Sequence, residues 1–148
     1  MPSFSVCRMQ IEIRRMTDVD LPAVEAIQTA SLPNSAAGWA AHDFLKLEAW
    51  VLLEQGQIVA FLVARKVIDD EFELLNMAVA PQHRRRGFGR ALLIEVLDRF
   101  PGIWFLEVRA SNTAAEALYQ DLGFHRSGRR RNYYSSPLED AIEMTKLS

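Results

Sequence analysis

Apolar and polar residues alternate near the start of the chain, around Ile11, Ile13 and Met16, and this alternation predicts a first strand. A helix is expected next, with Thr17 or Asp18 as its cap and with apolar residues at helical spacing: Leu21, Val24, Ile27 and Ala30. A loop marked by proline, asparagine and glycine follows it, and we expect a second short helix over residues 40–47.

The middle of the chain has the pattern of three strands. The first begins near Trp50, turns at residues 55–57 and returns as a second strand over 58–67, so these two form a hairpin. The third strand covers residues 72–79, and Pro81 ends it.

The pattern then changes to helical spacing. Gly87 and Gly89 lead into a helix whose core positions are Leu92, Leu93, Val96 and Leu97. Pro101 and Gly102 end this helix. Residues 103–108 form an almost continuously apolar strand that a single acid, Glu107, interrupts.

A last helix is expected from Asn112 to Leu122, with Gly123 as its C-terminal cap, and strands follow near residues 126–133 and 141–147. This order predicts an α/β fold. Its centre is a mixed, mostly antiparallel sheet of about seven strands, flanked by four helices.

Composition fits one domain, which we expect to span residues 1–148, with 1–9 poorly ordered. The chain has 148 residues, of which 49% are hydrophobic. A formal net charge of −2 argues against a general nucleic-acid binder, so no direct nucleic-acid binding is expected. With a single cysteine, Cys7, and neither a signal segment nor an apolar run that spans a bilayer, we expect a cytoplasmic protein away from the membrane.

A strand, a glycine-containing turn and a helix start follow one another over residues 79–90. Free N–H groups at a helix start favour an anion, and Gly87 and Gly89 let the backbone approach a phosphate. Leu92 stands where the Rossmann pattern needs its third glycine, and the Walker pattern is absent. The segment indicates a phosphate site; a solvated basic turn is the alternative.

The spacing Arg84-x-x-Gly87-x-Gly89 resembles the acetyl-CoA pyrophosphate loop of the Gcn5-related N-acetyltransferases. Residues 75–79 look like that family's preceding strand, and residues 117–124 like its other common signature. The resemblance covers nearly the whole chain and implies the family's fold, acetyl-CoA as acetyl donor and no metal. The three histidines also lack the spacing of metal ligands.

A more specific resemblance connects the chain with the RimI branch of this family. It rests on residues 106–112, 131–134 and 139–141 together with the segment around Tyr119. Members of that branch acetylate the N-terminal alanine of the eighteenth small-subunit ribosomal protein, and the resemblance implies a protein N-terminus as acceptor. Ala40 departs from the pattern, since the family usually has serine there.

The resemblance also assigns roles to residues. Glu107 becomes the general base and Tyr119 the acid that protonates the leaving thiolate, whereas an exposed strand acid and a core tyrosine are the ordinary interpretations. Acceptor contacts are expected from Trp39, Tyr133 and Tyr134. Cofactor contacts are expected from Met77, Ala78, Val79, Arg84, Arg85, Arg86, Gly87, Phe88, Gly89, Arg90 and Asn112.

Amine chemistry supports the acceptor that the resemblance implies, because only a neutral amine attacks a thioester. An α-amine has a pKa of about 7.7–8.0 and a lysine about 10.4, so a modest base suffices for the α-amine. A lysine side chain or a small amine is the alternative acceptor, and a non-catalytic CoA-binding domain is a third hypothesis. Residues 129–131 are three arginines that either contact RNA or an acidic peptide or protect a sheet edge. We expect a monomer or a weak dimer.

Overall fold

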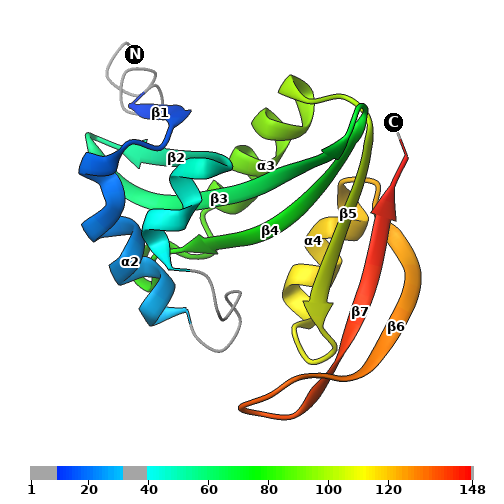
Figure 1. Cartoon of the computed structure of the whole chain (residues 1–148). Helices are drawn as coiled ribbons and strands as arrows, with labels where there is room; N and C mark the ends of the chain where they lie inside the picture. Colours follow the sequence, from blue (N-terminus) through cyan, green and yellow to red (C-terminus); the bar gives the residue numbers. More distant parts are fainter. Residues whose placement is uncertain (1–9, 32–39, 148) are drawn as a thin grey trace.

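The computed structural model describes residues 10–31 and 40–147, which form one sheet with helices on both faces (Figure 1). The sheet has seven strands in the order β1-β2-β3-β4-β5-β7-β6. Only β4 and β5 pair in parallel, and every other neighbouring pair is antiparallel. The strands are β1 (Ile11–Arg15), β2 (Glu48–Glu54), β3 (Gln57–Ile68), β4 (Glu71–Val79), β5 (Ile103–Arg109), β6 (His125–Tyr134) and β7 (Glu139–Lys146).

The helices lie on opposite sides of this sheet. In Figure 1, α2 and η2 lie in front of β1–β4, and α3 and α4 lie behind the sheet. The α-helices are α2 (Leu21–Ala30), α3 (Phe88–Arg99) and α4 (Thr113–Asp121), and the 3-10 turns are η1 (Asp18–Asp20), η2 (Ala41–Lys46) and η3 (Pro81–His83). The expected α/β fold, with seven strands and four flanking helices, is confirmed; the second of those helices, η2, is a 3-10 helix.

Both faces of β2 and of the first part of β3 are buried, which explains their runs of consecutive apolar residues. On β2, Leu52 packs into the cluster that contains α3, and Val51 packs into the cluster that contains α2. On β3, Leu62 and Phe61 divide in the same way, and Phe61 stacks on Phe44 of η2 with ring centroids 5.7 Å apart. Successive strand residues point to opposite faces, so covering both faces requires apolar residues at consecutive positions.

An acidic residue fixes the start of the first helical segment. Asp20 is 4% exposed, and the Arg14 guanidinium donates to both of its carboxylate oxygens, at 2.7 and 3.0 Å. The Thr17 backbone N–H also donates to Asp20, at 2.8 Å, in a reciprocal capping arrangement. The paired guanidinium, followed by the N–H of Thr17, lowers the pKa of Asp20 although burial opposes the change.

Strands β4 and β5 separate partway along their length. They pair from Glu71 with Ile103 to Leu74 with Leu106, and no pairing between them is recorded beyond that point. The rest of β4 remains hydrogen-bonded to β3, and the rest of β5 to β7. Figure 1 shows the two strands diverging below this contact. The sheet therefore has an opening at its centre, with backbone edges of β4 and β5 along its two sides.

Candidate active site

Glu107 is the first residue of β5 beyond the last register pair with β4, Leu74 with Leu106. Its neighbours Leu106 and Val108 belong to the core on the α3 side of the sheet. Since strand side chains alternate, Glu107 points to the other face, and its side chain is 19% exposed. The glutamate therefore lies at the narrow end of the opening, on the face that carries α2.

Charged and phenolic groups surround the Glu107 carboxylate. The Arg130 Nε lies 2.8 Å from Glu107 Oε2, and the same nitrogen lies 3.3 Å from Glu143 Oε2. The Glu107 charge, then burial, then a hydrogen bond to Glu107 raise the pKa of the Tyr133 hydroxyl. Together with Glu73 and Glu143, Glu107 and Arg130 line a cavity of about 260 Å³. A base at this position has its charge compensated locally and remains open to a small acceptor group.

Tyr119 reaches the same region from the opposite face of the sheet. It is 8% exposed on α4 and packs edge-on against Phe124, with ring centroids 5.8 Å apart. Burial, with a smaller contribution from Tyr134, raises the pKa of Tyr119 to about 12. The phenol therefore stays protonated at physiological pH and can donate a proton or a hydrogen bond.

Tyr134 connects the two candidate catalytic groups. Burial, followed by the Glu107 charge, raises the pKa of Tyr134 to about 12, and Tyr134 in turn contributes to the raised pKa of Tyr119. Its neighbour Tyr133 is 48% exposed and meets it edge-on, with ring centroids 5.1 Å apart. The structure thus places both predicted acceptor-binding tyrosines beside Glu107. Trp39 lies outside the described residues.

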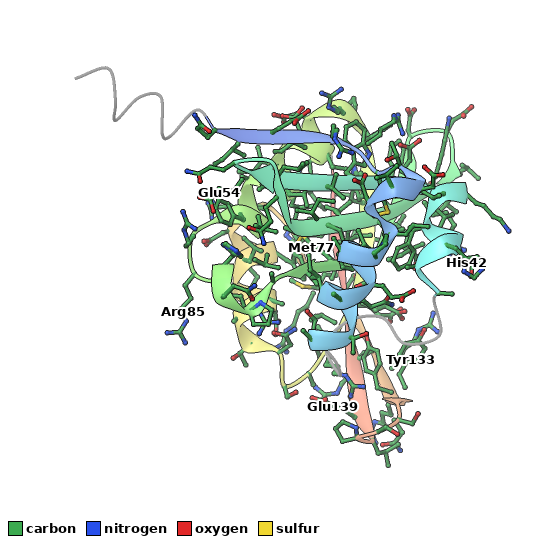
Figure 2. All side chains as sticks on the ribbon, turned by 90° about the vertical axis from the view of Figure 1, so that its left-hand side faces the viewer. His42, Glu54, Met77, Arg85, Tyr133 and Glu139 are labelled. Carbon is green, nitrogen blue, oxygen red and sulfur yellow. The ribbon has the colours of Figure 1, made fainter. Side chains whose placement is uncertain are left out.

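The predicted phosphate turn has the expected geometry. Gly87 is the N-cap of α3 with φ +82°, a left-handed conformation that glycine adopts without strain. A Cβ on Gly89 would lie 3.4 Å from Val79 Cγ2 and 3.8 Å from Met77 Cε, so the first turn of α3 packs closely against the end of β4. Met77 lies near the centre of the view in Figure 2. Phe88 begins the helix and is buried, so its role includes packing.

Three arginines of the loop have partners within the chain. Arg84 donates to the Val79 carbonyl at 3.1 Å and to Ser31 Oγ at 3.2 Å. Arg86 donates to both carboxylate oxygens of Glu54, at 2.9 and 2.5 Å. Arg90 lies 3.2 Å from Asp121. These contacts hold the loop to β2, β4, α2 and α4, and phosphate binding by their side chains remains a prediction.

Arg85 differs from the other arginines of the loop. Its φ is +65°, and Figure 2 shows its side chain extending away from the ribbon. No hydrogen bond or ion pair is recorded between it and any residue in the described part of the chain. Arg85 is thus the arginine of this loop whose charge is available to a bound phosphate.

One hydrogen bond shows which backbone groups of β4 face the opening. The Ala80 N–H donates to the Val59 carbonyl of β3 at 2.8 Å. Because backbone groups of successive residues alternate in direction, Val79 and Met77 direct theirs toward the opening, whereas Ala78 faces β3. Among the three residues predicted to contact pantetheine, Met77 and Val79 therefore direct their backbone groups toward the opening, where the Val79 carbonyl already accepts a hydrogen bond from Arg84.

Asn112 occupies the start of α4. Its Oδ1 accepts a hydrogen bond from the Ala115 N–H at 3.3 Å, so the predicted capping role is confirmed. Contact of Asn112 with a cofactor remains a prediction.

A buried arginine, which the sequence interpretation left without a role, organises the β6–β7 loop. Arg109 is 5% exposed, and its guanidinium donates to the carbonyls of Pro137 at 3.0 Å and Ser135 at 3.4 Å. It also lies 3.3 Å from Glu139, whose carboxylate accepts from the Ser111 N–H. The sequence feature that could have revealed this role is an arginine within an apolar strand, because a buried cation needs partners.

The arginine run at residues 129–131 lies on β6, the edge strand of the sheet. Arg129 pairs with Asp140 at 2.7 Å, and Arg130 pairs with Glu107 and Glu143. Arg129 and Arg130 thus form ion pairs with acidic residues in the described part of the chain. In the described residues, no helix is long and apolar enough to cross a membrane. The same part of the chain holds no group of three or more histidine, cysteine or acidic residues that could bind a metal ion.

A mixed sheet that opens between two parallel strands, with a glycine-containing helix start at one end of the opening, is typical of the N-acetyltransferase fold. The sequence model of the acetyltransferase (GNAT) family matches residues 14–124, and the chain belongs to this family. It is 39% identical over 140 residues to the ribosomal protein bS18-alanine N-acetyltransferase of Escherichia coli K12, an alignment that covers 89% of this chain and 94% of that protein.

Solved structures show the same relationship. The crystal structure of the ribosomal-protein-S18-alanine N-acetyltransferase from Escherichia coli superimposes with a TM-score of 0.80 and 36% identity, over 93% of each chain. Ard1 from Thermoplasma volcanium superimposes with a TM-score of 0.83 and 27% identity, over 94% of this chain and 98% of that one. The family that the sequence motifs indicated, and its RimI-type resemblance, are confirmed.

Proposed function

We propose that this enzyme transfers the acetyl group of acetyl-CoA to the N-terminal α-amine of a protein that begins with alanine, and that this protein is a small-subunit ribosomal protein. The Escherichia coli relative and the Escherichia coli crystal structure described above share most of its length and carry that activity in their names. The observation that carries the chemistry is the opening between β4 and β5, with Glu107 on one face of the sheet and Tyr119 on the other.

The two faces suit the two halves of an acyl transfer. An amine that approaches from the α2 face meets Glu107, which removes its proton directly or through a water as nitrogen bonds to the thioester carbon. The carbon–sulfur bond then breaks, and Tyr119 gives a proton to the departing thiolate from the α4 face. The Val79 N–H faces the opening and stabilises the developing oxyanion.

The remaining contacts hold acetyl-CoA across the same opening. The N–H groups at the start of α3 and the Arg85 charge bind the pyrophosphate, and the β4 backbone at Met77 and Val79 binds the pantetheine arm. Tyr133 and Tyr134 form the wall along which an extended chain end lies. A pocket closed by aromatic rings favours a small first side chain.

A direct test compares two isosteric glutamate variants. Glu107→Gln should retain acetyl-CoA affinity and lose about 10²–10⁴-fold in kcat with an alanine-initiated peptide, because general-base catalysis is lost. Glu73→Gln removes a carboxylate from the same cavity, where Glu73 pairs with Arg65, and should retain kcat within about threefold. Thiol release and mass spectrometry of the peptide measure both. Wild-type turnover in the Glu107→Gln variant would remove Glu107 from the mechanism.

A further inference from the structure

We propose that Arg130 is a positioning residue for acetyl transfer: its cation pairs with the Glu107 carboxylate and favours the neutral form of the acceptor amine beside it. The proposal rests on the function proposed above and adds a residue outside the predicted site. Arg130 acts through Glu107 and the amine, and no contact between Arg130 and acetyl-CoA is part of the proposal.

The geometry places the Arg130 cation against one oxygen of the Glu107 carboxylate. Arg130 Nε lies 2.8 Å from Glu107 Oε2, yet this oxygen is buried and accepts no hydrogen bond from any described residue. The contact is therefore an ion pair at the buried oxygen, and an amine or a water can approach only the part of the Glu107 side chain that is exposed, 19% of it. Arg130 also lies over the Tyr133 ring, with its guanidinium carbon 5.2 Å from the centroid, so it is held from two sides.

Among the described residues, no second cation is recorded in an ion pair with Glu107. Glu73 of β4 is paired with Arg65, and Glu143 of β7 shares Arg130 with Glu107. The phenols of Tyr133 and Tyr134 on β6 are both neutral, with raised pKa values. The other nearby cation, Arg109 of β5, is paired with Glu139. The Glu107 charge is correspondingly the first cause that raises the pKa of Arg130, followed by a hydrogen bond to Glu143.

A cation at this position acts on both reactants in the same direction. The reactive state pairs a carboxylate with a neutral amine, and it carries one positive charge fewer than the state with an ammonium. Arg130 stabilises the state with fewer positive charges, so it moves the onset of activity to lower pH. Half of the Arg130 side chain is exposed, so solvent screening limits the effect to about 0.5–1 pH unit.

The test is the pH profile of the single-turnover rate, measured with saturating acetyl-CoA and acceptor peptide. Arg130→Gln should move the acidic limb upward by about 0.5–1 pH unit, so its rate falls about 3–10-fold at pH 6.5 and returns to within about twofold near pH 9.5. Arg130→Lys keeps the charge and should keep the limb near the wild-type pH. Arg129→Gln removes an equal charge from the same strand, where the partner is Asp140, and should leave the limb in place.

Two results would overturn the proposal: an unshifted limb in Arg130→Gln, or a rate that falls by the same factor at every pH, as a purely structural loss would produce. A different result would refute the function proposed above: a wild-type enzyme that labels a lysine or a small amine in preference to the peptide terminus. In that case the profile is measured with the preferred amine, and the same criteria apply to Arg130. An enzyme that labels no amine refutes both proposals.

Discussion

Arg109 holds Tyr134 in place: the guanidinium carbon lies 4.5 Å from the centroid of the Tyr134 ring, and its nitrogens donate to carbonyls of the β6–β7 loop. A planar fork that stacks on a ring and bonds several carbonyls is a geometry that lysine cannot reproduce. The position of the acceptor wall therefore depends on a residue of β5, the strand that also carries Glu107.

The first prediction follows from this contact. Arg109→Lys keeps the charge but loses the fork, so it should destabilise the protein by about 1–3 kcal/mol and raise KM for the acceptor peptide about tenfold. Acetyl-CoA affinity should be unchanged, because the α3 end of the opening is untouched. Steady-state kinetics and calorimetry measure the two effects. Arg126→Lys, on β6 with Glu116 as partner, is the control and should leave KM unchanged.

The second prediction concerns Tyr119 in catalysis. Tyr119→Phe removes the proton donor and should lower kcat about 10²-fold with little change in acetyl-CoA affinity. Because the pKa of Tyr119 is raised to about 12, the wild-type rate should show no falling limb from this group below about pH 10. A fall in wild-type kcat between pH 8 and 10 that Tyr119→Phe abolishes would contradict the assignment.

The same phenol gives a third prediction, on stability. Its pKa is higher in the folded chain, about 12, than the ordinary value of about 10, so burial favours the protonated form in the folded state. The stability linked to this group is therefore fully present below pH 10 and is lost as pH rises from about 10 through 12, by up to about 3 kcal/mol. Urea unfolding at pH 8 and pH 11 should show a smaller loss for Tyr119→Phe than for wild type. Parallel losses would show that other groups cause the alkaline destabilisation.

The fourth prediction separates Arg85 from the other arginines of its loop. Arg85→Asn suits the left-handed backbone at this position and should leave stability unchanged, while the acetyl-CoA Kd rises about 3–10-fold. Arg99→Gln removes the same charge at the far end of α3, where Arg99 pairs with Glu95, and should not alter that Kd. The Kd values come from calorimetry at low and moderate salt. Equal Kd values for wild type and Arg85→Asn would place the pyrophosphate away from this side chain.

The pattern of apolar, polar and glycine residues close together in the sequence was enough to predict most elements of the fold. The β2–β3 hairpin, the start of α3 at a glycine and the Asn112 cap all depend on residues close together in sequence. The 3-10 form of η2 did not follow from its sequence, because short apolar segments do not distinguish the two kinds of helix.

The arrangement of the site depends on contacts between strands that are distant in sequence, and the sequence pattern does not reveal these contacts. The separation of β4 from β5 beyond Leu74 and Leu106 is set by their other neighbours, β3 and β7. The same limit applies to Arg130: a run of three arginines does not reveal which of them meets Glu107 across the sheet. The roles of Glu107 and Tyr119 came from the family resemblance, and only activity measurements test them.

The most direct test of the account is a competition between two acceptors. Equal amounts of a peptide with a free N-terminal alanine and of the same peptide with a blocked terminus and an internal lysine are incubated with acetyl-CoA and enzyme, and mass spectrometry locates the acetyl group. A single glutamate base suits an α-amine whose pKa lies about 2.5 units below that of lysine. We predict labelling of the alanine amine in large excess. Equal or faster labelling of the lysine would contradict N-terminal acetylation as the function of this enzyme.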